Sequence, residues 1–181
     1  MTQGDLLTGS VPNAEDRGAD LSDDGRYRFR LWRIWDWDMP VDCWIMLNPS
    51  TADATDDDLT IKKCRGFSQR GGLAGGIMVV NLYALRATDP ADLLRSAHPV
   101  GTGTDVWLLA EARAAGRVIA AWGANVLHGR VGIGGRDEHV LGLLAARRVP
   151  VLCLGTTRDG HPRHPSRLAY DTPFVPFRRA A

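Results

Sequence analysis

The alternation of short apolar runs with helix-like segments constrains the fold of this chain more than any other feature of its sequence. Four apolar runs have the length of buried strands, and each of them stops at a polar or glycine-containing loop. These runs cover residues 41–47, 76–82, 117–122 and 149–154. Four further segments carry helix signals, and they cover residues 59–70, 91–96, 104–115 and 139–147. Strands that alternate with helices predict an α/β fold with three α/β/α layers and a central, mainly parallel sheet of four to five strands.

Two further parts of the chain add to this predicted fold. They are the residues before the first apolar run and the loop directly after it. Residues 27–37 alternate aromatic or aliphatic side chains with arginine or aspartate, which predicts an opening strand at the edge of the sheet. Residues 1–24 are polar and acidic without apolar periodicity, so we expect them to be flexible. The aspartates at residues 56–58 precede a helix-like segment, and one of them can cap its amides. We therefore expect one domain over residues 25–181 behind a flexible acidic segment.

Charge is divided unevenly along the chain. The formal net charge is only +1, but residues 1–60 hold 5 basic and 13 acidic side chains, whereas residues 61–181 hold 17 and 8. An acidic flexible start with a solvated basic surface explains this division as well as a basic face that binds polyanions. Nucleic acid is therefore a candidate partner, and both interpretations stay open.

Several other signals exclude classes of site. Three cysteines without paired spacing indicate free thiols in a reducing cytoplasm, and no apolar stretch is long enough to cross a bilayer. His161 and His164 lack a third ligand at a diagnostic spacing, so we predict no metal and no other cofactor. Cys153 has no adjacent base and is a poor candidate for a nucleophile. The glycines at residues 132–135 lack the spacing of a phosphate-binding loop and predict a turn.

Polar or turn-forming residues follow each of the four predicted buried strands. Asn48 follows the first strand, Asn81 ends the second, Trp122 ends the third, and the loop at residues 156–168 follows the fourth. In open α/β sheets, ligands bind in loops beyond the carboxyl ends of the strands. We therefore expect these four loops to form the functional site.

Four short motifs at these strand ends resemble, in the same order, the motifs of uracil-DNA glycosylases. They read IMLNPS, VVNL, VIAAWGA and HPSRL. The corresponding glycosylase motifs are a strand ending in Asn-Pro or Asp-Pro, a strand ending in Asn, a strand ending in Trp-Gly and a His-Pro-Ser-x-Leu loop. Residues 26–174 also resemble a bacterial and phage family called domain of unknown function 1643, through LNPSTAD, DDDLTIKKC, VVNLYALRATDP and a GxPRHP loop. That family name assigns no activity, so the functional expectation comes from the glycosylase resemblance.

The glycosylase resemblance implies a role for individual residues. Asn48 would orient the attacking water, although an amide cannot deprotonate it, and Asp53 is the nearest carboxylate that could help. Asn81 would read the edge of a flipped base. His164 would stabilise negative charge on the departing base, and Leu168 would fill the gap in the base stack.

Two departures from the glycosylase pattern affect specificity and DNA contact. Ser50 stands where the uracil-specific enzymes carry a tyrosine that rejects 5-substituted pyrimidines, so the pocket is expected to admit such a substituent. Arg167 replaces a proline. It could add a phosphate contact, or it could disturb the geometry of Leu168, the wedge that would fill the gap in the base stack. Phe67 or Tyr83 could stack on the base.

The resemblance places the DNA contacts on the last loop, at Arg163, Ser166, Arg167 and Leu168.

Each of these residues also has a structural interpretation that the sequence leaves open. Asp53 can bond its own loop, and Asn81 can close a turn at its strand end. His164 can be a surface side chain, and Phe67 and Leu168 can pack in the core.

The leading hypothesis from the sequence is a DNA glycosylase that flips and releases uracil or a 5-substituted pyrimidine, as in DNA repair. We expect a monomer that binds DNA rather than RNA. A nucleic-acid module that recognises modified bases without hydrolysis is the first alternative. An enzyme that acts on free nucleosides or nucleotides is the second.

Overall fold

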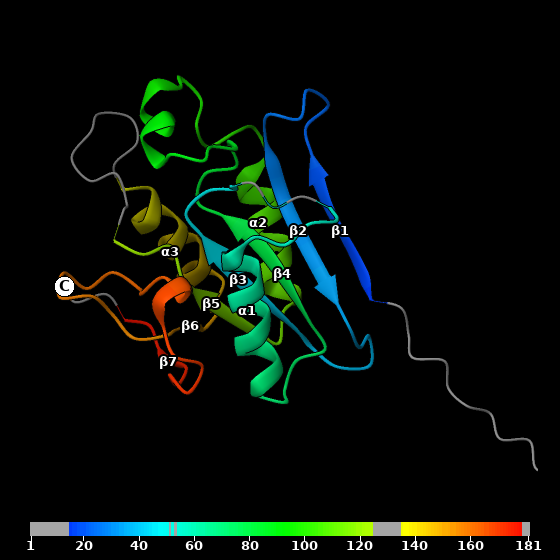
Figure 1. Cartoon of the computed structure of the whole chain (residues 1–181). Helices are drawn as coiled ribbons and strands as arrows, with labels where there is room; N and C mark the ends of the chain where they lie inside the picture. The colour runs from blue at the N-terminus through cyan, green and yellow to red at the C-terminus, as the bar shows by residue number, and fades with distance from the viewer. Residues whose placement is uncertain (1–14, 51, 53, 125–134, 179–181) are drawn as a thin grey trace, which may run out of the picture.

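A mixed sheet of seven strands forms the centre of the protein (Figure 1). The structure is a computed structural model and describes residues 15–50, 52, 54–124 and 135–178. The strands are β1 (Asp16–Leu21), β2 (Arg28–Ile34), β3 (Val41–Met46), β4 (Gly76–Asn81), β5 (Arg117–Ala120), β6 (Val151–Cys153) and β7 (Val175–Pro176). They lie side by side in the order β1-β2-β4-β3-β5-β6-β7.

Four neighbouring strands in the middle of this sheet run in the same direction. β3 pairs in parallel with both β4 and β5, and β5 pairs in parallel with β6. β2 and β1 extend one side with antiparallel pairings, and β7 pairs antiparallel to β6 on the other. The carboxyl ends of β3, β4, β5 and β6 therefore meet at one edge of the sheet, where ligands bind in folds of this type.

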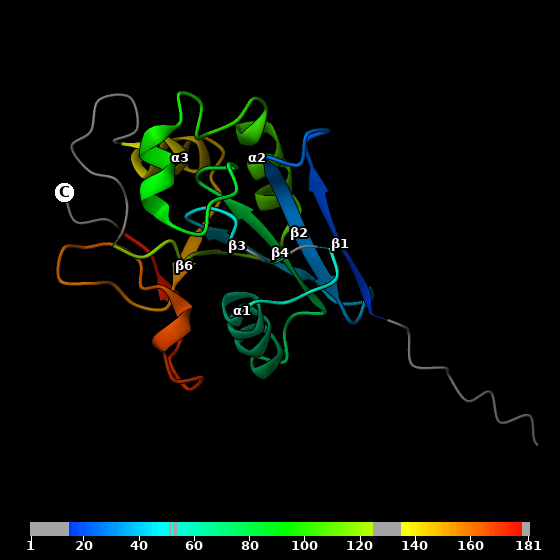
Figure 2. The same ribbon diagram turned by 45° about the horizontal axis from the view of Figure 1, so that its top comes forward.

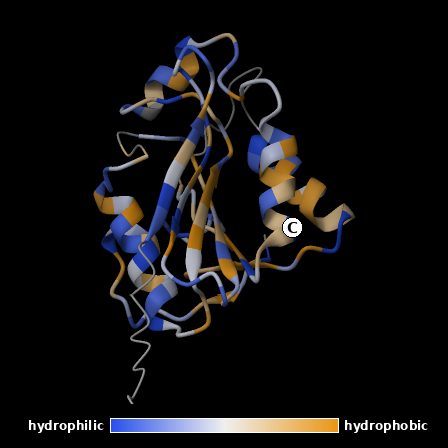
Figure 3. Ribbon diagram, turned by 90° about the vertical axis from the view of Figure 1, so that its right-hand side faces the viewer, coloured by the Kyte–Doolittle hydropathy of each residue, from blue (hydrophilic) through white to orange (hydrophobic). Residues whose placement is uncertain are grey.

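Helices cover both faces of the sheet (Figure 2). The α-helices of the described residues are α1 (Leu59–Arg70), α2 (Thr104–Ala114) and α3 (Arg136–Ala146). Two short 3₁₀ helices, η1 (Pro90–Arg95) and η2 (Pro165–Arg167), lie in the loops. Figure 3 shows helices on both sides of the strands, and several of the strands carry orange, hydrophobic stretches. No helix in the described ranges combines the length and apolarity that crossing a membrane requires.

The inner strands are mostly apolar because both faces of the sheet are covered, although polar residues such as Asp42 and Asn81 stand near their ends. In β3, Cys43 and Ile45 belong to the core that also contains α2 and α3 residues. Trp44 and Met46 belong to the second core, which contains the buried face of α1. This alternation follows from the two-residue period of a strand, and burial on both sides is typical of parallel sheets.

The predicted α/β class is confirmed, and each of the apolar runs contains a strand. The sheet is larger than expected, because β1 and β7 extend it to seven strands. The segment at residues 91–96 is the 3₁₀ helix η1, and α3 begins at Arg136 rather than at residue 139.

Strand β1 lies within the segment that we expected to be flexible. Its sequence is polar, so it carries no apolar alternation, and its place depends on backbone pairing with β2. Gly18 lets the two strands approach closely, since a Cβ atom there would lie 2.2 Å from the ring of Trp32. An ion pair of 2.5 Å between Arg30 and Asp20 also joins them. Such an edge strand is specified by its partner rather than by its own pattern.

Candidate functional site

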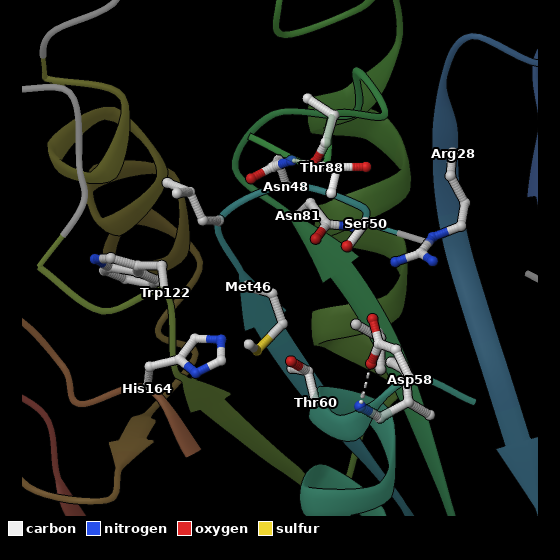
Figure 4. A pocket seen from close by; sticks show the side chains of 14 residues that line it. Arg28, Met46, Asn48, Ser50, Asp58, Thr60, Asn81, Thr88, Trp122 and His164 are labelled. Atoms are coloured by element: carbon white, nitrogen blue, oxygen red, sulfur yellow. Dashed lines mark hydrogen bonds between the residues drawn. The ribbon is translucent and has the colours of Figure 1, made fainter. Parts of the chain in front are cut away.

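A polar pocket opens at the carboxyl ends of the parallel strands (Figure 4). Its cavity volume is about 180 Å³, below the range of about 300–1,000 Å³ that is typical of pockets for drug-sized ligands. This size favours a small chemical group. The charged and amide side chains that line it are Arg28, Asn48, Asp58, Asn81 and His164. Ser50 and Trp122 also line it, so the pocket draws on the loop after each of the four parallel strands.

Asn81 at the end of β4 has the most unusual environment in this pocket. Its side chain is 1% exposed, and neither Oδ1 nor Nδ2 has a hydrogen-bond partner among the described residues. A buried polar group without a partner costs about 1–3 kcal/mol. Figure 4 shows its amide pointing into the space beside Ser50. The lining of the pocket therefore holds one acceptor and one donor side by side that the described residues leave unpaired.

Asn48 is held in a fixed orientation. Its Nδ2 atom donates hydrogen bonds to the carbonyl oxygens of Ala87, at 2.7 Å, and Pro49, at 3.0 Å. The amide oxygen takes part in neither bond. Asn48 can therefore present an acceptor to a water molecule, but it has no basic atom to receive a proton.

His164 lies half-buried on the loop after β6. Its Nδ1 atom accepts a hydrogen bond from the backbone amide of Ser166 at 3.3 Å and lies 2.9 Å from the Ser166 hydroxyl. Burial lowers the pKa of His164 below its ordinary value, and the nearby charge of Asp58 only partly offsets this effect. The ring is therefore neutral at pH 7. Because Nδ1 is an acceptor, the proton sits on Nε2, which leaves a neutral N–H donor for a ligand.

Asp58 contributes the carboxylate of the described lining. It caps α1, and its Oδ1 atom accepts a hydrogen bond of 2.8 Å from the amide of Ile61. The predicted capping role of the aspartate run is thus confirmed. Sequence reasoning did not predict that Asp58 also faces the pocket, because capping is a local signal and the pocket forms between distant segments.

Arginines from the first two strands hold the loop that leads to Asp58. Arg28 donates to the carbonyl oxygen of Ala52 at 2.6 Å, and Arg17 donates to that of Thr55 at 2.8 Å. The side chain of Arg33, which is 0% exposed, pairs with Asp57 at 2.7 Å. Arg28 also lines the pocket. The sequence did not predict this, because the alternating pattern of its strand does not show which side chains face a pocket. These contacts fix the backbone from which the Asp58 side chain extends.

Several other predicted site residues lie away from the pocket lining, in the core. Phe67 packs in the second core, which contains the buried face of α1, and its ring centroid lies 5.1 Å from that of Tyr170. Tyr83 is fully buried, and burial raises its pKa to about 12. Leu168 is 5% exposed and packs in the same core as Phe67. The structure therefore places these three side chains where they stabilise the fold.

The remaining predicted residues are divided between the loop surface and undescribed positions. Arg163 and Arg167 are exposed on either side of His164, and Ser166 orients the imidazole. Asp53 lies outside the described residues, as do most of the glycines at residues 132–135. In the portion of the chain that the structure describes, no three His, Cys, Asp or Glu side chains gather as metal ligands would. Burial also raises the pKa of the Cys153 thiol, which makes it a poor nucleophile.

Fold and pocket together define an α/β protein with a small polar pocket at the carboxyl ends of its parallel strands. The family described as "Protein of unknown function (DUF1643)" matches residues 28–166. This match covers well over half of the chain, so the protein belongs to the DUF1643 family. No curated protein and no solved structure matches the chain.

Proposed function

We propose that the pocket binds a flipped pyrimidine base and hydrolyses the N-glycosidic bond that joins it to its sugar in DNA. The substrate would be uracil or a 5-substituted pyrimidine, and the fold would be related to that of the uracil-DNA glycosylases. The observation that carries this proposal is the buried amide of Asn81 at the end of β4, whose two polar atoms have no hydrogen-bond partner among the residues that the structure describes.

A pyrimidine edge would pair with that amide. Uracil and its 5-substituted forms present a ring N–H beside a carbonyl oxygen. The Asn81 Oδ1 atom would accept from the ring nitrogen, while Nδ2 would donate to the carbonyl. A single base would thus satisfy both of the atoms that lack a partner within the described part of the chain, which would offset the cost of burying this amide.

The neutral His164 would act on the leaving base. Negative charge develops on the base only as the glycosidic bond breaks, so a donor placed there stabilises the transition state more than the bound substrate. The Nε2–H group of His164 is available for this bond because Ser166 occupies Nδ1. Burial favours the neutral form of the imidazole. His164 would therefore donate this hydrogen bond as a neutral N–H group rather than as an imidazolium.

Asn48 and Ser50 would complete the reaction site. The amide oxygen of Asn48 would orient water toward the anomeric carbon, where oxocarbenium character lowers the demand on the nucleophile. The small side chain of Ser50 lines the pocket and leaves room for a substituent on carbon 5 of the base.

Contacts to DNA would come from the loop that carries His164. Arg163 and Arg167 are exposed on this loop and can bind backbone phosphates. Leu168 packs in the core, so we assign it no wedge role.

A base-release assay tests the proposal. Purified protein is incubated with duplex and single-stranded oligonucleotides that carry uracil or 5-hydroxymethyluracil, and abasic sites are then cleaved with alkali. We expect strand breaks with the wild type and a loss of about 10²-fold in kcat for His164→Ala. Asn48→Ala should also slow release. His98→Ala removes an exposed histidine outside this pocket and serves as the matched control.

The result of the same assay also tests a second function. Asn48 places an amide rather than a carboxylate at the proposed water position, which favours a module that recognises modified bases without cleaving them. Salt-sensitive binding of the same oligonucleotides with no strand breaks would support this function and contradict hydrolysis. Turnover of free nucleosides with no action on oligonucleotides would instead support an enzyme of monomers.

A further inference from the structure

The proposed hydrolysis lacks a group that can take a proton from water, because Asn48 is an amide. Asp58 is the single carboxylate among the described residues that line the pocket. Its two oxygen atoms have different surroundings. Oδ1 accepts the capping bond of 2.8 Å from the Ile61 amide, and Oδ2 makes no hydrogen bond with any residue in the described ranges. One oxygen therefore anchors the carboxylate, and the other is left for a ligand or water.

The position of Asp58 fits this use. Figure 4 shows Asp58 and His164 on opposite sides of the pocket, with Met46 between them. The charge of Asp58 reaches His164, since it acts on the pKa of that imidazole. The other charged group of the described lining is Arg28, which donates to the Ala52 carbonyl. A bond cleaved between Asp58 and His164 would have a carboxylate on the sugar side and an N–H donor on the base side.

We propose that Asp58 is the general base of this pocket, an inference that rests on the proposed glycosidic hydrolysis. The oxygen of a water molecule bonds to the anomeric carbon as the bond from that carbon to the base nitrogen breaks. The electron pair of the broken bond stays on the base, where His164 Nε2–H donates to it. The proton of the water passes to Asp58 Oδ2 and then to solvent, and the released base takes up a proton from solvent. One water molecule is consumed.

Local structure holds the carboxylate in one orientation for this step. The capping bond fixes the side chain at the start of α1, and Arg33 holds the preceding Asp57 at 2.7 Å. A general base must lie within hydrogen-bond reach of the proton that it removes, so a fixed rotamer favours this role. The same capping bond means that deleting the side chain would also weaken the helix.

The substitution Asp58→Asn separates the two roles. Asparagine caps helices about as well as aspartate, and it has nearly the same shape, but it cannot accept a proton. The matched control is Asp89→Asn. Asp89 also caps a helix, with a bond of 2.8 Å from the Ala91 amide, and it is exposed outside the pocket lining.

The assay measures single-turnover release from a single-stranded oligonucleotide that carries one 2′-deoxyuridine or 5-hydroxymethyl-2′-deoxyuridine. We expect Asp58→Asn to slow release by about 10²–10⁴-fold with an unchanged melting temperature, and Asp89→Asn to match the wild type. Release within about twofold of the wild-type rate by Asp58→Asn would overturn the inference and leave Asp58 as a cap, since a general base contributes far more. No release by the wild type would overturn the proposed function itself.

Chemical rescue provides a second measurement. Its result would stay unchanged if Asp58 had only a structural role. Asp58→Ser keeps a capping hydroxyl and leaves space beside the pocket. Added formate should restore part of the rate of Asp58→Ser, because it supplies a carboxylate, and should leave the rate of His164→Ala unchanged.

Discussion

Two buried polar side chains at opposite ends of the parallel strands differ in how they are satisfied. Asp42, near the start of β3, and Asn81, at the end of β4, are each 1% exposed. Asp42 accepts bonds of 2.8 and 2.6 Å from Arg117 and one of 2.6 Å from the Ser68 hydroxyl. Asn81 has no partner for either amide atom among the described residues.

This difference separates a buried residue whose polar atoms are satisfied by the fold from one whose polar atoms are not. A buried charge is tolerated when it is paired and hydrogen-bonded, and removing one partner is then strongly destabilising. A buried amide without partners makes the free protein less stable. We infer that the Asp42 end of the sheet stabilises the fold and that the Asn81 end binds the ligand.

The largest expected effect is on stability, at the paired end. Asp42→Ala should lower the free energy of unfolding by about 3–5 kcal/mol, because it leaves the Arg117 guanidinium without its carboxylate. Urea unfolding measures this change. Asp92→Ala is the control, since it breaks an exposed ion pair with Arg95 and should cost less than about 1 kcal/mol. Equal losses in the two variants would remove the distinction on which the comparison depends.

At the unpaired end, the effect should fall on activity instead. Asn81→Leu should leave the free energy of unfolding unchanged or raise it, because it removes two unsatisfied atoms and keeps a similar shape. Base release should fall on the order of 10³-fold, since a site that pairs with a polar edge loses strongly when that pairing is removed. The two measurements are urea unfolding and the base-release assay. A loss of stability as large as that of Asp42→Ala would contradict the comparison.

The smallest expected effect concerns the pH dependence of stability near the unpaired end. Burial lowers the pKa of His164 in the folded state below the unfolded value of about 6.5. The unfolded chain therefore binds more protons as the pH falls, so the stability from a neutral His164 is complete above about pH 6.5 and decreases below it. His164→Gln should flatten the dependence of the unfolding free energy on pH below about pH 6.5, as measured by urea unfolding. An unchanged dependence would show that the folded protein does not disfavour the imidazolium.

Local signals made much of the fold predictable. The apolar runs gave the positions of β3, β4, β5 and β6, because strands buried on both faces are mostly apolar. The aspartate run indicated the start of α1, which Asp58 caps. Since parallel strands present their carboxyl ends at one edge, the sequence also predicted that Asn48, Asn81 and His164 would share a pocket.

Long-range packing decided what the sequence left open. Whether Phe67, Tyr83 and Leu168 face a ligand or the core depends on which segments pack against them, and no local pattern records that. The polar strand β1 is formed by pairing with β2 rather than by its own periodicity.

The sequence alone therefore determined the class of fold, the order of its inner elements and the polar residues at the strand ends, because these follow from periodicity and spacing along the chain. Only the tertiary structure showed that Asn81 is buried without a hydrogen-bond partner in the described ranges and that Asp58 and His164 lie on opposite sides of the pocket. The reason is physical: hydrogen-bond satisfaction and burial depend on groups far apart in the sequence, and only folding brings these groups together.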